Sequence, residues 1–194
     1  MLHAARLTSF LLPSCLLAVA PSAAVAAPER AGFTGDLSIG ASLMTRQVTS
    51  FSGGSNVPFT SETSTVYEPG LAPLGLSLGG YLTPRLALLG RLSGTSYFRG
   101  DEQILHMFAG PVVEFWPHDR WFVSGGVGLG SLTPNPLLGS SLVTPRQGVA
   151  FDARAGAVLA GGVRHAVTAS LEVIPAIYKH FQAGAALLVA WKWY

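Results

Sequence analysis

An all-β fold is predicted by three features of the sequence. Only 11% of the 194 residues are charged, against about 25% in an ordinary soluble domain, whereas 49% are hydrophobic. Glycine and proline contribute 23 and 13 residues, a content that disfavours both helical bundles and long transmembrane helices. Short segments of alternating apolar and polar residues are separated by turn-forming residues, which is typical of strands with one apolar and one polar face.

The charge balance and the hydrophobicity exclude two further classes of protein. Twelve basic and ten acidic residues give a net charge of +2, which offers no basic surface for nucleic acid. Intrinsic disorder requires a low hydrophobic content, which this chain does not have. The composition therefore indicates a structured, glycine-rich chain with very few charges.

Residues 1–26 have the features of a cleaved signal peptide. Arg6 precedes an apolar stretch, and Ala24-Val25-Ala26 is the expected cleavage site. An uncleaved membrane anchor is the alternative, but Pro13 and Pro21 interrupt a segment already short for the roughly 20 residues that a span needs. A lipoprotein at Cys15 is a further alternative, although the apolar run continues past this residue. We expect a mature chain without cysteine.

Eight segments of the remaining chain are predicted strands. After a short N-terminal segment at 27–32, one domain covers 33–194, with strands at about 33–44, 70–82, 86–98, 104–116, 121–132, 148–163, 166–178 and 181–194. The first strand is the clearest, with Phe33, Leu37, Ile39, Ala41 and Leu43 on one parity. The second is similar, with Ala72, Leu74, Leu76, Leu78 and Leu82 on its apolar face. The eighth alternates as clearly as the second, the sixth and seventh less clearly, and glycine blurs the pattern in the fourth and fifth.

The connectors alternate between short and long. Residues 83–85, 117–120 and 164–165 are tight turns, whereas 45–69 and 133–147 are long and rich in residues that suit solvent. In an up-and-down meander every second connection emerges at the same end, so short turns are expected on one side and loops on the other. A loop as long as 45–69 is unusual in a compact soluble domain and ordinary on an outer-membrane barrel.

Charged residues within the predicted strands all fall on the less apolar parity. They are Asp36, Arg91, Glu114, Asp152, Arg154, Glu172 and Lys192. A charge on the lipid-facing side of a barrel costs about 2 to 4 kcal/mol at the bilayer midplane. We therefore expect these seven side chains to form a hydrogen-bonded ion network inside a closed barrel.

Aromatic residues concentrate near the predicted strand ends. On the short-turn side the predicted membrane-interface residues are Tyr81, Trp116, Trp121, Trp191, Trp193 and Tyr194. On the long-loop side they are Tyr97, Phe98, Phe151, Tyr178 and Phe181. Two interfacial girdles explain this distribution, and packing in a soluble core is the alternative.

No arrangement of residues indicates catalysis or metal binding. No two histidines have the spacing of metal ligands. His106 and Glu114 share one strand face, but eight residues place them about 26 Å apart. An enzyme that trims lipid A is the sharpest alternative, yet the nearest candidates, His165, Ser170 and Glu172, lack the His-x-Ser spacing of such lipases. We expect no enzymatic activity, no cofactor and no metal.

The chain resembles the small bacterial outer-membrane β-barrel superfamily, which includes the transmembrane domain of outer membrane protein A. The resemblance covers roughly 33–194 and rests on the Gly-Tyr-Leu-Thr-Pro-Arg-Leu-Ala-Leu turn at 80–88, the alternating strands and the aromatic C-terminus at 187–194. It implies that the last strand is recognised by the barrel assembly machinery. The apolar parity of that strand ends on Trp193 rather than on Tyr194, which departs from the family pattern.

These observations predict an eight-stranded antiparallel up-and-down transmembrane β-barrel in a bacterial outer membrane. Eight strands leave an interior just wide enough for side chains, so we expect a structural or surface-interaction role rather than free diffusion. The surroundings would be outer-membrane lipid and lipopolysaccharide, with 45–69 and 133–147 presented outside, and a monomer is expected. A narrow transport barrel for small apolar solutes and a soluble lipocalin-like binder with its apolar parity inside are further alternatives.

Overall fold

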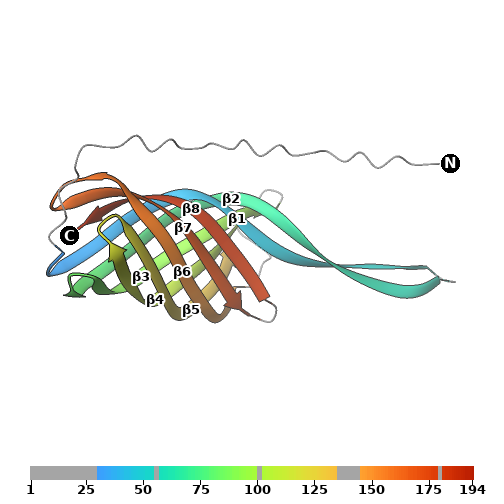
Figure 1. Ribbon diagram of the computed structural model, residues 1–194. Coiled ribbons are helices and arrows are strands. Elements are labelled where there is room, and N and C mark those ends of the chain that lie inside the picture. The colour runs from blue at the N-terminus through green and yellow to red at the C-terminus, as the bar shows by residue number, and fades with distance from the viewer. Residues whose placement is uncertain (1–29, 55–56, 100–101, 135–144, 179–180) are drawn as a thin grey trace.

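The described part of the chain is a closed barrel of eight antiparallel strands. The computed structural model describes residues 30–54, 57–99, 102–134, 145–178 and 181–194 (Figure 1). The strands are β1 (Phe33–Gly54), β2 (Val57–Thr83), β3 (Leu86–Arg99), β4 (Glu102–His118), β5 (Trp121–Pro134), β6 (Arg146–Gly161), β7 (His165–Ile177) and β8 (Phe181–Trp193). Each strand pairs with its neighbours in sequence, and β1 pairs with β8 to close the ring.

The structure confirms the predicted class, strand number and strand order. The predicted signal peptide at 1–26 lies outside the described residues, as do 135–144 of the predicted loop at 133–147. Among the described residues, no helix is long and apolar enough to cross a membrane.

Burial alternates along the strands, with the polar parity inside the barrel. In β1, Thr34 and Asp36 are fully buried, whereas 61% of Phe33 and 60% of Ile39 are exposed. Thirty large hydrophobic side chains of the described residues are exposed in this way. Because successive strand residues point to opposite faces, the same period of two that creates the apolar outer wall fills the interior with polar groups.

Residues 45–69 form most of a projecting β-hairpin rather than the predicted loop. β1 and β2 remain paired from Thr45↔Tyr67 to Gly54↔Val57, with an irregularity next to Gly54. The paired strands extend well beyond the barrel wall (Figure 1). A ribbon that leaves the barrel does not enclose its interior, so it does not need the alternation by which the other strands were recognised. The threonine and valine content, which favours strands, was the available signal.

A register shift in β2 moves one predicted outer residue to the interior. The β1–β2 pairing shifts between Ser38 and Gly40, and this shift reverses the parity of β2. Ala72, predicted on the apolar outer face, is therefore buried, whereas Leu71 is exposed. Pro73 lies at the shift and has no backbone N–H to contribute to a ladder, so a bulge is favoured there.

Serine side chains replace part of the ladder between β2 and β3. The backbone pairing of these strands covers only Leu76 to Thr83 of β2. Beyond it, the Ser96 hydroxyl donates to the Leu71 carbonyl at 2.9 Å and accepts from the Leu71 N–H at 3.3 Å. The Ser42 hydroxyl donates to the Ser96 carbonyl at 3.1 Å and accepts from its N–H at 3.3 Å. These hydroxyls satisfy backbone groups that the interrupted ladder leaves without partners.

Apolar clusters fill the interior around the charged residues. One cluster contains Ala87, Leu89, Phe108, Val112, Ala150, Ile174 and Ala176. A second contains Met44, Tyr97, Ile104 and Leu132. Met44 and Leu132 lie in the half of the barrel nearest the projecting hairpin and the connector between β5 and β6. The interior is therefore packed with side chains, as expected for an eight-stranded barrel.

Candidate functional site

The candidate site is a cluster of charged side chains inside the barrel. Six strands contribute to it, and the exposed fraction of every member is 4% or less. The members are Asp36 of β1, Arg91 of β3, Glu114 of β4, Asp152 and Arg154 of β6, Glu172 of β7 and Lys192 of β8. We call these seven residues the ion network.

Asp36 is the residue that most of the cations share. The Arg154 Nη1 donates to the Oδ2 and Oδ1 atoms of Asp36 at 3.1 and 3.2 Å. The Arg91 Nη1 lies 3.5 Å from Oδ1, and the Lys192 Nζ lies 3.7 Å from Oδ2. One carboxylate from the first strand is thus surrounded by cations from three other strands, which compensates the cost of burying it.

Arg91 connects this carboxylate to β7. Its Nε donates to the Glu172 Oε1 at 2.8 Å, and its Nη2 lies 2.6 Å from the same atom. Its Nη1 also donates to the Ser77 hydroxyl at 2.6 Å, while the Ser93 hydroxyl donates to the Glu172 Oε2 at 2.7 Å. Hydroxyls from β2 and β3 therefore complete the hydrogen bonding of a buried arginine–carboxylate pair.

Lys192 and Glu114 form a second pair beside aromatic rings. The Lys192 Nζ lies 2.8 Å from Oε1 and 2.9 Å from Oε2 of Glu114, and the Trp116 indole N–H donates to Oε1 at 2.8 Å. The Lys192 Nζ also lies 5.6 Å from the ring centres of Trp116 and Phe122. The rings favour the cation electrostatically while they exclude water.

The ion network holds one more acid than base, and Asp152 has the weakest partners. Four carboxylates and three cations give 3 − 4 = −1. Asp152 lies 3.7 Å from the Arg91 Nε, and neither of its oxygens accepts a hydrogen bond from the described residues. Arg154 of the same strand instead donates its Nε to the Ser170 hydroxyl at 2.8 Å.

Aromatic rings and an arginine close the short-turn end of the interior. The Arg30 guanidinium lies 3.8 Å from the centre of the Trp116 ring, and only 7% of Arg30 is exposed. Its Nη1 lies 3.5 Å from the Asp119 carboxylate. Trp116 packs against Phe122 at 5.1 Å and against Tyr194 at 6.0 Å between ring centres. Sequence reasoning missed Arg30, because it precedes the first strand and no periodicity applies to it.

Three of the six aromatic residues predicted at the short-turn interface face the interior instead. Trp116 is fully buried, and the hydroxyls of Tyr81 and Tyr194 are buried. Trp116 shares the parity of Glu114, and Tyr194 shares that of Lys192, so the period of two places them inside. The sequence prediction placed these three residues at the membrane interface because they lie near strand ends. Strand parity, which places them inside, is the stronger constraint.

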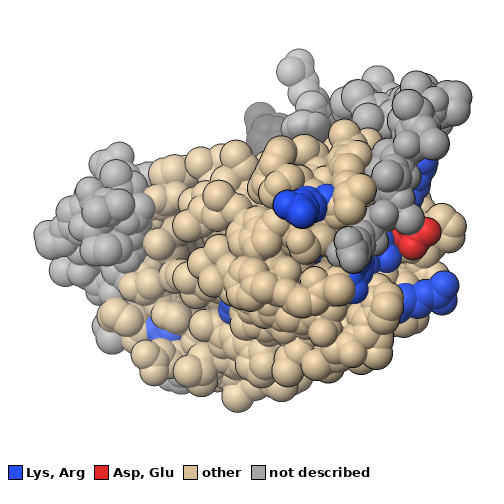
Figure 2. Space-filling view, turned by 90° about the vertical axis from the view of Figure 1, so that its left-hand side faces the viewer, with Lys and Arg blue, Asp and Glu red and all other residues tan. Residues whose placement is uncertain are grey.

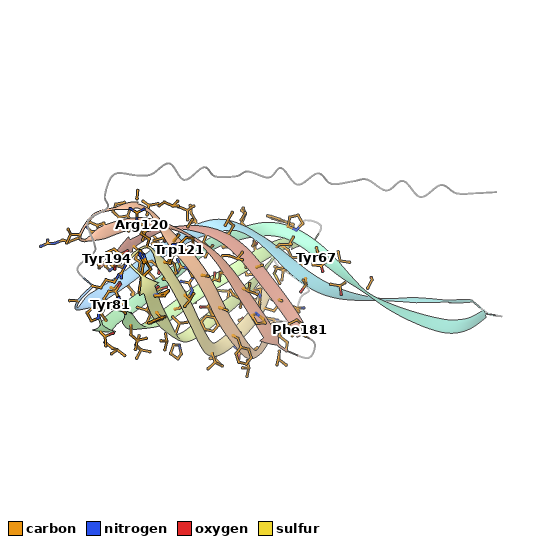
Figure 3. The ribbon with its side chains drawn as sticks, viewed as in Figure 1. Tyr67, Tyr81, Arg120, Trp121, Phe181 and Tyr194 are labelled. Carbon is orange, nitrogen blue, oxygen red and sulfur yellow. The ribbon has the colours of Figure 1, made fainter. Side chains whose placement is uncertain are left out.

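The other three short-turn residues lie on the outer wall or at its edge, whereas Tyr97 and Tyr178, predicted at the long-loop interface, pack inside the barrel. Trp121 is 60% exposed and Trp191 is 53% exposed, whereas Trp193 is half-buried. Figure 3 shows Trp121 and Arg120 at the short-turn end, with Tyr67 and Phe181 at the opposite end of the barrel. Exposed aromatic residues thus border the apolar wall at both ends.

The residues considered for catalysis do not come together. His165 lies exposed at a turn, where its ring packs 5.5 Å from that of Trp191. Ser170 and Glu172 are buried in the ion network, bonded to Arg154 and Arg91. Within the described segments, no group of three or more histidine, cysteine or acidic residues has a geometry that could hold a metal ion. The geometry supports packing and charge compensation.

Known proteins match this chain in fold but not in sequence. No family model matches the sequence, and no curated protein matches it. Neisserial surface protein A matches with a TM-score of 0.55 and 12% identity, over 84% of this chain and 96% of that one. Ail, the attachment invasion locus protein of Yersinia pestis, matches with a TM-score of 0.52 and 11% identity, over 84% and 99%. The chain is therefore similar in fold to the small eight-stranded outer-membrane β-barrel proteins, the superfamily that its sequence resembles.

Proposed function

We propose that this protein is an integral β-barrel of the bacterial outer membrane with a structural or surface-interaction role. In this proposal the ion network plugs the interior, and the projecting β1–β2 hairpin is presented to the outside. The short turns and the C-terminal end of the last strand face the periplasm, as in other barrels of this kind. The barrel assembly machinery would recognise β8, and the barrel would work as a monomer without enzymatic activity.

One observation carries the proposal, namely the inverted distribution of polarity across the barrel wall. Seven charged side chains are buried inside the ring, and thirty large hydrophobic side chains of the described residues are exposed outside it. A soluble protein rarely exposes a large contiguous apolar surface, because contact with water is unfavourable. A lipocalin-like binder would have the opposite arrangement, with its apolar parity around a central ligand.

Membrane fractionation tests the location, and electrophoresis tests the folded barrel. We expect the processed chain in the outer-membrane fraction, extractable only with detergent, and migrating differently before and after boiling. Recovery of a folded, detergent-free protein in the soluble fraction would contradict the proposal. A planar bilayer containing the purified barrel should show no steady ion conductance, because the ion network and the rings at the short-turn end occupy the interior.

A narrow transport barrel for small apolar solutes is the second candidate. The observation that favours it is the interrupted pairing of β2 and β3, which ends at Leu76. An outer groove of about 420 Å³ lies at that point, lined by Leu76, Leu78, Gly90, Arg91, Leu92 and Gly110. Apolar Met44 and Ile104 occupy the interior in the half of the barrel beyond the interruption. These features place apolar surfaces on both sides of the least regular part of the wall.

Uptake by whole cells separates the two candidates. Lipopolysaccharide slows the entry of apolar solutes, so a transport barrel should accelerate accumulation of an apolar fluorophore such as N-phenylnaphthylamine. A barrel with a structural role should leave the uptake rate equal to that of cells carrying the empty vector. Comparison at equal amounts of folded protein, judged by gel mobility, removes differences in expression.

A further inference from the structure

Four backbone contacts repeat one arrangement around the short-turn end of the barrel. In each, the residue immediately before an odd-numbered strand accepts a hydrogen bond through its carbonyl from an N–H of the next even-numbered strand or, for Tyr194, of the residue directly after that strand. The pairs are Gly32 with Tyr81 at 2.9 Å, Arg85 with Trp116 at 2.9 Å, Arg120 with Val158 at 2.9 Å and Arg164 with Tyr194 at 3.0 Å. The four acceptor residues therefore occupy equivalent positions on this rim.

Arginine occupies three of these four equivalent positions. Arg85, Arg120 and Arg164 precede β3, β5 and β7. Consecutive members are two strand spacings apart, about 10 Å along the rim. Arg85 and Arg164 are exposed, and Arg120 is half-buried. The backbone contacts fix all three at one level of the barrel, so they form a basic arc, which we call the arginine rim.

Little negative charge on the described residues competes for the arginine rim. The acidic side chain described at this end is Asp119, and it already lies 3.5 Å from Arg30. Figure 2 looks at this end and shows more basic than acidic surface in view. In the sequence, by contrast, the segments 45–69, 99–103, 133–147 and 179–180 together carry four acidic and four basic residues. Among the residues described at the short-turn end, basic side chains therefore outnumber acidic ones.

The arginine rim borders the apolar outer wall directly. Trp121, which follows Arg120, is 60% exposed, and Leu82, which lies three residues before Arg85, is 65% exposed. Trp191 is 53% exposed, and its ring packs against His165, the residue that follows Arg164. Exposed tryptophan marks the level of the lipid headgroups, where phosphates lie. Guanidinium groups bind phosphate oxygens in pairs of parallel hydrogen bonds.

We propose that the arginine rim binds the phosphodiester groups of anionic phospholipids in the leaflet that borders the short turns. This inference rests on the proposed insertion of the barrel in a bilayer. The partner is recognised by its net negative charge, since the phosphate of a zwitterionic lipid is offset by its own ammonium group. Binding selects an anionic lipid shell on one side of the membrane and fixes the depth of the short-turn end.

Brominated lipids provide the test, because bromine quenches only nearby tryptophans, and Trp121 and Trp191 lie next to the arginine rim. The barrel is reconstituted in equal mixtures of phosphatidylcholine and phosphatidylglycerol, with bromine on either one lipid or the other. For the wild type, we expect brominated phosphatidylglycerol to quench more strongly, corresponding to an enrichment of about fivefold at low salt. The enrichment should fall in 0.5 M NaCl, because salt screens exposed charges.

Substitutions test whether the arginine rim causes the preference for phosphatidylglycerol. The two brominated lipids should quench the tryptophan fluorescence of the triple variant R85Q/R120Q/R164Q equally. The control R146Q changes an exposed arginine of the opposite end and should retain the wild-type ratio of quenching by the two lipids. Equal quenching in the wild type, or a preference that survives the triple substitution, would overturn the inference. Absence of quenching by both lipids would instead contradict bilayer insertion and so the proposed function. Gel mobility before and after boiling verifies that each variant is folded.

Discussion

Lys192 and Glu114 pair across the interior of the barrel, although β8 and β4 are not neighbours in the sheet. The Lys192 Nζ lies 2.8 and 2.9 Å from the two carboxylate oxygens. The Trp116 indole N–H holds one of these oxygens at 2.8 Å. The pair therefore connects opposite walls of the ring, and the Trp116 indole helps to fix its geometry.

Removal of one partner of this pair should be much worse than removal of both. K192M leaves Glu114 buried without its closest cation, and we expect a loss of about 3 to 5 kcal/mol in the free energy of unfolding. The double variant K192M/E114Q should recover most of that loss, because no uncompensated charge remains at this position. Urea unfolding of the barrel refolded in detergent, followed by tryptophan fluorescence, measures both. Equal destabilisation by the single and double variants would exclude the coupling.

Two matched amide substitutions should separate the best and the least compensated carboxylates. D36N and D152N make the same change in net charge, but Asp36 lies within 3.7 Å of three cations, whereas Asp152 lies that close to Arg91 alone and accepts no hydrogen bond from the described residues. We expect D36N to cost about 2 to 5 kcal/mol, and D152N to cost less than about 1 kcal/mol or to stabilise. The same urea unfolding experiment compares them. A larger loss for D152N than for D36N would contradict the assigned contacts.

Tryptophan substitutions should show which indoles contact lipid. Trp116 is fully buried in the interior, whereas Trp121 is 60% exposed on the outer wall. W121F should therefore reduce the fraction of fluorescence that brominated phosphatidylcholine quenches, and W116F should increase that fraction by removing a shielded fluorophore. The reverse pattern would mean that Trp116 contacts lipid and Trp121 does not, which would contradict the structure.

The serine contacts between β2 and β3 should control local opening of the wall. S96A removes the hydroxyl that bonds both backbone groups of Leu71 and accepts from the Gln103 amide at 3.1 Å. We expect faster hydrogen exchange at the Leu71 N–H and a loss of about 1 to 3 kcal/mol, since backbone groups lose their partners. S124A, whose hydroxyl makes no hydrogen bond with the described residues, is the matched control. Unchanged exchange at Leu71 in S96A would show that the hydroxyl does not hold the strands together.

Tyr194 should make stability decrease in strongly alkaline solution. Burial raises its pKa from 10.0 to about 12. The folded state therefore retains the phenolic proton between these values while the unfolded state loses it, so the contribution of Tyr194 is intact below pH 10 and is lost as pH rises toward 12. Between pH 9 and pH 11, the wild type should lose more unfolding free energy than Y194F. Parallel losses in the two proteins would mean that the phenol is not shielded.

The period of two explains most of what could be predicted. Because Asp36, Arg91 and Lys192 share a parity with small and polar residues, their burial inside a closed barrel follows from strand geometry once the outer medium is taken as apolar. Applied to β4, the same rule would have placed Trp116 beside Glu114 in the interior. The prediction of an interface residue there came from proximity to a turn, which is a weaker constraint than strand parity.

Other features had no signal in the alternation. The projecting hairpin at 45–69 has strand-forming residues, but its sequence does not alternate between apolar and polar residues. The position of Ala72 depends on a register shift at Pro73, and such a shift reverses the face of the residues on one side of it relative to those on the other. Arg30 reaches Trp116 from outside the strands, so only the closed structure brings the two together.

The sequence by itself determined the number and order of the strands, the apolar outer wall and the identity of the buried charges, because each depends on neighbours one or two residues away along a strand. Only the tertiary structure decided which charges pair and which one remains poorly compensated. It also decided that three turn arginines share one level of the rim. Pairing across the interior depends on the stagger of strands around the closed ring, and that stagger is fixed by contacts between residues far apart in the chain.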